Sequence, residues 1–181
     1  MSIVRAVIVA ATQIGECFAG DGADAAHVNT VLGRYGGPVE TAWTTALATP
    51  RPGHAAFVAV LRPNLPVQPL TLFVNKATIA GERHGELTWG AAQAGVAVGV
   101  ADAVAAGIVP ETEAADLLLI VAVWVNPDAR DADAVYANNR RATADALANG
   151  AARRPSVADV LAQRHEPVNP YYTPPPATPE A

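Results

Sequence analysis

Residues suited to acid–base chemistry follow a glycine-rich turn near the start of the chain. The turn reads Gly20-Asp21-Gly22, and both residue types favour tight turns. After it, residues 26–32 alternate polar and apolar side chains, as a strand with one covered face does. His27 and Asn29 are two positions apart, so on a strand both point away from the core. His27 is therefore a candidate general acid or base; the plainer alternative is a surface histidine with one hydrogen bond.

A second polar pair occurs in a later apolar segment. We expect a strand over residues 70–79, in which Lys76 and Thr78 share one face. The chain has no P-loop for a nucleotide, and none of its Cys or His residues has the spacing of metal ligands. Gly20-Asp21-Gly22 is not a dinucleotide fingerprint either, because it lacks a third glycine and leads into a strand. The two polar pairs are therefore the side chains of the predicted sheet that we consider as candidate functional residues.

The remaining pattern predicts the elements that must position these pairs. A hairpin joins strands over 14–19 and 26–32, and the apolar run 55–61 reads as a buried central strand. A further strand is expected over 117–125. Helices are expected from Pro38, over 88–106, from a cap at 126–128 to about 149, and over 156–164. This order predicts an α/β (α+β) two-layer sandwich, a mixed β-sheet with helices packed on it.

Composition narrows the class of protein. The chain has 181 residues and a net charge of −5 without a basic run, which argues against nucleic acid as a partner. Cys17 is the only cysteine, so we expect no intrachain disulfide and a reducing, cytoplasmic location. No Cys or His spacing suggests a metal site, and we expect no membrane span. The three tryptophans, Trp43, Trp89 and Trp124, are interpreted as packing residues.

The sequence suggests a single domain with a distinct tail. We place the domain at residues 1–166 and a proline-rich C-terminal tail at 167–181. The first eleven residues read as a strand or a flexible start, with a secretory signal as the minor alternative.

Five segments in order resemble the formaldehyde-activating enzyme family. They are Gly15-Glu16 with Gly20-Asp21-Gly22 and Ala26-His27-Val28; the loop 46–54; Pro63-Asn64-Leu65-Pro66; Asn75-Lys76-Ala77-Thr78-Ile79; and residues 90–97 with 102–104. The resemblance extends from about Gly15 to Val125 and weakens beyond. Each segment alone is a weak signal, whereas five in sequence are specific.

The resemblance implies a fold, an assembly and a reaction. Members condense formaldehyde with tetrahydromethanopterin, their co-substrate, releasing water and giving methylene-tetrahydromethanopterin. The implied fold is like a domain of a small-subunit ribosomal protein, with a left-handed βαβ crossover. The implied assembly is a homopentamer that binds the pterin between adjacent subunits and needs no metal. By motif match the catalytic histidine is His27, and the pterin-contacting positions are Asn29, Val58, Lys76, Thr78 and Gln93.

One departure from the family pattern bears on activity. The family has aspartate two residues after the histidine, where this chain has Asn29; Val58 replaces a leucine. Asparagine still forms hydrogen bonds but carries no charge. The sequence therefore leaves three hypotheses: the family's lyase; a catalytically weakened homologue that binds formaldehyde or a pterin as a sensor or binding protein; and an enzyme for another carbonyl or amine cofactor.

Overall fold

A five-stranded mixed sheet forms the centre of the protein. The computed structural model describes residues 11–169 and 172–175. The strand order is β1-β2-β7-β6-β3, formed by β1 (Gln13–Ala19), β2 (Ala26–Arg34), β7 (Leu117–Val125), β6 (Leu70–Asn75) and β3 (Phe57–Val58). Neighbours pair antiparallel except β6 and β7, which are parallel. The predicted mixed sheet is confirmed.

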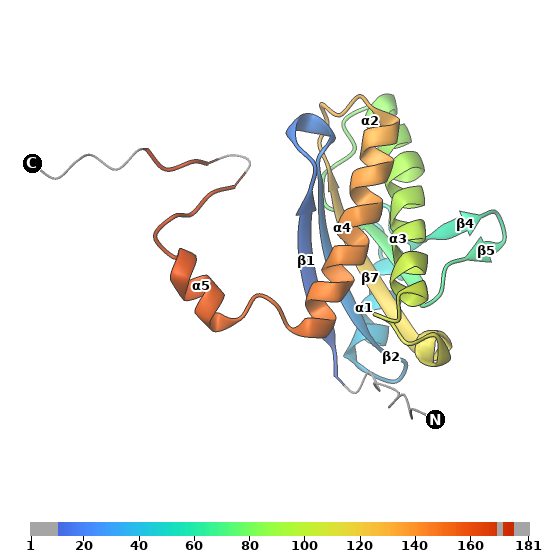
Figure 1. Ribbon diagram of the computed structural model, residues 1–181. Coiled ribbons are helices and arrows are strands. Elements are labelled where there is room, and N and C mark those ends of the chain that lie inside the picture. Colours follow the sequence, from blue (N-terminus) through green and yellow to red (C-terminus); the bar gives the residue numbers. More distant parts are fainter. Residues whose placement is uncertain (1–10, 170–171, 176–181) are drawn as a thin grey trace, which may run out of the picture.

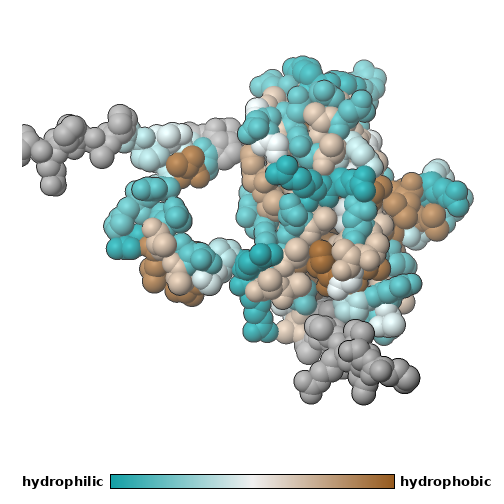
Figure 2. Space-filling view, in the orientation of Figure 1, coloured by the Kyte–Doolittle hydropathy of each residue, from teal (hydrophilic) through white to brown (hydrophobic). Residues whose placement is uncertain are grey.

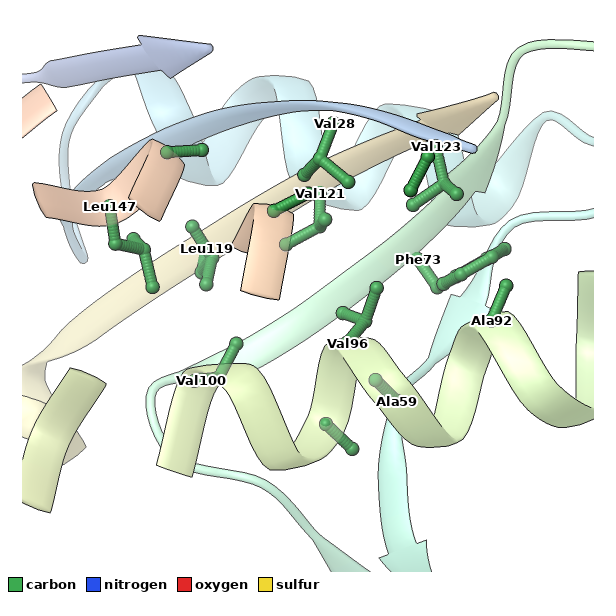
Figure 3. Packing of buried hydrophobic residues seen from close by; sticks show 14 of the residues in the cluster. Val28, Ala59, Phe73, Ala92, Val96, Val100, Leu119, Val121, Val123 and Leu147 are labelled. Carbon is green, nitrogen blue, oxygen red and sulfur yellow. The ribbon is translucent and has the colours of Figure 1, made fainter. Parts of the chain in front are cut away.

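Two long helices cover one face of this sheet, and a shorter helix covers part of the other (Figure 1). The first face carries α3 (Gln93–Ala105) and α4 (Ala132–Ala152). Figure 3 shows Val96 and Val100 of α3 packing toward Phe73, Leu119 and Val121 of the strands. On the second face, α1 (Pro38–Ala48) buries Val39 and Trp43 against Leu72 and Leu118. The helix-on-sheet architecture is confirmed, with α1 as a partial third layer.

The hairpin before the first helix forms as predicted. Ala19 pairs with Ala26 across a turn that contains the 3₁₀ segment η1 (Gly22–Asp24), and Gly20 and Gly22 have φ of 81° and 64°. These positive values favour glycine. The alternation of β2 is also confirmed, because its four residues of even number from 26 to 32 are at most 1% exposed: Ala26, Val28, Thr30 and Leu32.

The apolar run 55–61 is not a central strand. It forms β3 at the sheet edge and then β4 (Val60–Arg62), which pairs with β5 (Leu65–Pro66) in a separate hairpin. Its apolar residues are explained by packing: Phe57 stacks on Phe73 at 5.1 Å, and Ala59 is fully buried. Leu61 and Leu65 of the projecting hairpin are 44% and 42% exposed, and Figure 2 shows brown surface on this hairpin beside a teal tip.

Several helices and strands begin or end at other residues than predicted. The strand predicted over 70–79 ends at Asn75, and the helix predicted from Thr88 begins earlier, as α2 (Glu82–Glu86), continuing through a π-helical segment η2 (Leu87–Ala92) into α3. The cap of α4 is Asp131, whose carboxylate accepts from the backbone N–H groups of Asp133 and Ala134, instead of Asn126. Because α4 continues to Ala152, Gly150 lies inside it.

The end of the chain carries a short separate helix. The 3₁₀ segment η3 (Glu111–Asp116) precedes β7. As predicted, Ser156 opens the last helix, α5 (Val157–Gln163), and the structure adds a capping box there. In Figure 1, α5 lies apart from the sheet and its helices. The division at 166/167 stays a prediction, as do the handedness of the crossover and the likeness to a ribosomal domain. The prediction for the first eleven residues falls almost wholly outside the described ones.

In the part of the chain that the structure describes, one helix is long and apolar enough to cross a membrane by length and composition. It runs from Glu82 to Ala105, and 56% of its most apolar window is buried inside the fold. A buried core helix passes the same test, and the burial of this helix against the sheet is that of a core helix.

The contact of α3 with α4 generates a prediction for stability. A Cβ at Gly95 would collide with the carbonyl oxygen of Tyr136, so Gly95→Ala should destabilise the fold by about 1–3 kcal/mol. The control is Gly90→Ala, because a Cβ at Gly90 meets no atom within 4 Å. Urea unfolding measures both. Equal stabilities of the two variants would contradict the close helix contact.

Candidate active site

The β1–β2 hairpin brings four side chains onto one face. In the register, Glu16 is opposite Asn29 and Phe18 is opposite His27. The alternate residues of β1, which include Gly15 and Ala19, are buried toward α4. Because side chains alternate along a strand, all four residues therefore lie on the face that α3 and α4 leave open.

His27 is held by Glu16. Its Nε2 lies 3.0 Å from Glu16 Oε1, and its ring lies 6.1 Å from that of Phe18. The side chains of His27 and Glu16 are 37% and 59% exposed, so this ion pair is accessible to solvent. Within the described part of the chain, His27 Nδ1 has no hydrogen-bond partner. Nε2 of the ring is therefore in contact with Glu16, whereas Nδ1 is available to a bound molecule.

Lys76 reaches the same cluster from another strand. It follows β6, and its backbone N–H donates to Val123 O at 2.7 Å, which extends the parallel ladder by one residue. Its Nζ donates to Asn29 Oδ1. Burial lowers the pKa of the Lys76 amine, and the Glu16 carboxylate opposes this shift. The cluster therefore places a cationic donor, a carboxylate and an imidazole together.

A cleft of about 1020 Å³ opens over this cluster. Its walls are formed by the hairpin, by the ends of β6 and β7, and by two residues that follow α5: Glu16, Phe18, Asp21, Gly22, His27, Lys76, Trp124, Asn126, Val168 and Asn169. This volume is in the range of sites that bind small organic molecules. The aromatic side chains of Phe18 and Trp124 provide apolar surface beside the polar groups.

Thr78 belongs to the adjoining loop. His54 Nε2 lies 3.0 Å from Thr78 Oγ1, and His54 Nδ1 lies 3.0 Å from Asn75 O. The buried Asn75 side chain donates to Gly53 O and Ala77 O, both at 2.8 Å. These bonds tie the loop 51–54 to the segment that carries Lys76 and Thr78. Thr78 is not among the residues that line the cleft.

Val58 and Gln93 lie elsewhere in the chain. Val58, on the edge strand β3, packs with the α1 cluster. Gln93 is 9% exposed, and its Nε2 donates to Val60 O at 2.8 Å, which anchors the β4–β5 hairpin. The structure thus brings together three of the six predicted site residues, His27, Asn29 and Lys76, and leaves Val58 and Gln93 apart from them.

Sequence reasoning missed two side chains of the cluster's surroundings. Trp124, interpreted as a packing residue, lines the cleft, and Glu16 was not assigned a role. The signal for Glu16 is the hairpin itself, because a turn between Ala19 and Ala26 pairs Glu16 with Asn29. Among the described residues, no group of three or more His, Cys, Asp or Glu side chains is arranged to hold a metal ion.

Comparison with known proteins places this chain in a family. The model of the family described as formaldehyde-activating enzyme (Fae) matches residues 14–172. The chain is 42% identical to the 5,6,7,8-tetrahydromethanopterin hydro-lyase of Methanosarcina barkeri (strain Fusaro / DSM 804), over 88% of this chain and 90% of the relative.

Longer relatives match as well. The bifunctional enzyme Fae/Hps of Methanosphaera stadtmanae is 38% identical over 87% of this chain, and that of Archaeoglobus fulgidus is 36% identical over 88%. The matches cover only 39% and 40% of those two relatives. The family match and the identity to the hydro-lyase together show that this chain belongs to the formaldehyde-activating enzyme family.

Proposed function

We propose that this chain is a lyase that condenses formaldehyde with tetrahydromethanopterin to give methylene-tetrahydromethanopterin and water. The observation that carries the proposal is His27 at the cleft, with Nε2 on Glu16 and Nδ1 open. The name of the hydro-lyase relative, whose match covers most of both chains, supports the same reaction.

The reaction needs a proton donor at one step. Formaldehyde adds to a pterin nitrogen to give a carbinolamine, whose hydroxyl group is a poor leaving group. A proton from His27 converts that hydroxyl into water as the C–O bond breaks. The second pterin nitrogen then closes the resulting iminium ion and releases the proton that restores the imidazolium. Holding both nitrogens beside the reacting carbon provides further acceleration.

Lys76 and Asn29 act as pterin-binding residues in this proposal. Asn29 accepts a hydrogen bond from Lys76 without neutralising its charge, so the amine keeps a positive field over the cleft. The departure from the family's aspartate thus leaves the cation in place. Neither this geometry nor the relatives favour the alternative of a weakened binding homologue.

The other predicted contacts, Val58, Thr78 and Gln93, are assigned to a site shared by adjacent subunits of a homopentamer. The separation of Val58 and Gln93 from His27 within one chain supports this assignment. The exposed β4–β5 hairpin, anchored by Gln93, offers apolar surface for a neighbouring subunit. A cytoplasmic location is proposed on the single cysteine alone.

The general-acid role is tested by His27→Ala. Because general-acid catalysis contributes about 100- to 10,000-fold, kcat should fall at least ~100-fold relative to the wild-type chain. The assay follows methylene-tetrahydromethanopterin formation above the spontaneous reaction. The control is His165→Ala, since His165 is exposed and lies outside the cleft lining. Unchanged kcat in His27→Ala would contradict the role, and acceleration only after Asn29→Asp would favour the weakened homologue.

The charge at position 29 should control the titration of Lys76. Asn29→Asp places an anion beside the amine, which favours its protonated form. The lowered pKa of Lys76 should therefore rise, so the amine stays protonated to higher pH. NMR titration of the lysine side chain measures this change. Asn64→Asp at the exposed β4–β5 turn adds the same charge and should leave the Lys76 midpoint unmoved.

Complementation tests the shared site. His27→Ala and Gln93→Ala chains, each impaired alone, should regain activity when unfolded together and reassembled at equal amounts. Roughly a quarter of the sites in a random ring would combine an intact His27 with a neighbour's intact Gln93. Light scattering should report the mass of five chains. The assignment would be contradicted if a correctly assembled mixture regained no activity, or if light scattering gave the mass of a single chain.

A further inference from the structure

We propose that Glu16 is a positioning residue, which fixes the orientation of the His27 ring so that Nδ1 delivers the proton. This inference rests on the proposed function for its chemical meaning. Its geometry, however, is independent of any substrate. Glu16 Oε1 lies 3.0 Å from His27 Nε2, a hydrogen-bond distance for a carboxylate and an imidazole N–H.

The backbone beneath Glu16 is firmly held. A Cβ at Gly15 would collide with the carbonyl oxygen of Ala146, so β1 lies directly against α4 at this point. The Glu16 carbonyl oxygen accepts a hydrogen bond from Asn149 Nδ2 at 2.9 Å. Asn29 is opposite Glu16 in the register. These contacts set the point from which the Glu16 side chain extends toward His27.

The contact with Glu16 decides which nitrogen acts. A carboxylate only accepts hydrogen bonds, so the 3.0 Å contact favours the His27 tautomer that carries a proton on Nε2. Nδ1 has no partner among the described residues and is left for the substrate. In the imidazolium form, the Nδ1 proton passes to the leaving hydroxyl, the C–O bond breaks, and water departs. The histidine is then neutral with Nε2–H retained, and Glu16 stays ionised throughout.

The surroundings of His27 carry further charges. The charged side chains facing His27 are Glu16 from β1, Lys76 from the end of β6 and Asp21 from the turn. On the opposite face of β1, α4 presents its own charges beside Cys17, those of Arg141 and Asp145.

Glu16 also places a negative charge close to position 29. Glu16 provides a carboxylate across the strand pair from Asn29, and it contacts the histidine directly. This face therefore carries a carboxylate although residue 29 is uncharged. Lys76 responds to the same carboxylate, which raises its pKa against the effect of burial.

The test compares Glu16→Gln with Glu16→Asp and with Glu86→Gln, an exposed glutamate on α2 that pairs with Arg83. Two readouts are used: kcat, and the tautomer of His27 from ¹⁵N NMR of the substrate-free protein. In Glu16→Gln, kcat should fall about 10-fold or more, as for a lost orienting partner.

The tautomer readout separates positioning from general damage. An amide accepts or donates, so Glu16→Gln should show a mixture of His27 tautomers where the wild-type protein shows Nε2–H. Glu16→Asp, which keeps a carboxylate on a shorter side chain, should keep Nε2–H as the main tautomer, and Glu86→Gln should change neither readout. An unchanged tautomer in Glu16→Gln would overturn the inference. If the wild-type protein had no activity, the proposed function would be overturned instead. The tautomer of His27 would then still show whether Glu16 orients the ring.

Discussion

The close packing of β1 on α4 is the constraint on which the site depends. A glycine at position 15 lets the strand lie against the helix backbone, where a larger residue would collide with the Ala146 carbonyl. Once Gly15 faces the helix, strand alternation leaves no freedom: Glu16 must face the other way. The antiparallel register then sets Asn29 opposite Glu16, and His27 opposite Phe18. One backbone contact thereby fixes the face on which the polar side chains gather.

The parallel pairing of β6 with β7 completes the cluster. It carries Lys76 one residue beyond the strand, where its backbone still bonds to Val123 and its amine reaches Asn29. The loop behind it is tied down by Asn75 and His54. A cation that is partly buried, a carboxylate and an imidazole therefore meet at one end of the sheet. Such a combination suits a reaction whose difficult step is the departure of a hydroxyl group.

Local patterns in the sequence predicted the parts of the fold that depend on neighbouring residues. Turn glycines and alternation located the hairpin and the face of His27, and Ser156 marked the start of α5. The run 55–61 was misplaced because continuous apolar residues do not distinguish a central strand from an edge strand under a helix. The early start of the α2–α3 helix was missed where a π-helical segment interrupts the regular period.

The candidate site was predictable only in part, for a physical reason. Strand alternation identified His27 with Asn29, and Lys76 with Thr78, but not that a tertiary hydrogen bond joins Lys76 to Asn29. Thr78 bonds to His54 instead, through a loop closure that no periodicity encodes. Val58 and Gln93 entered through the family resemblance alone, and within one chain they lie away from His27. A site of the proposed kind, completed by a neighbouring subunit, would leave no local pattern in the sequence.

The most direct measurement is the initial rate of methylene-tetrahydromethanopterin formation from formaldehyde and tetrahydromethanopterin as the concentration of the wild-type protein is increased. The spontaneous rate is measured in the same buffer and subtracted. Catalysis predicts a rate that rises in proportion to protein concentration and saturates with the pterin. A rate that stays at the spontaneous value, with a folded protein in the assay, would contradict the account.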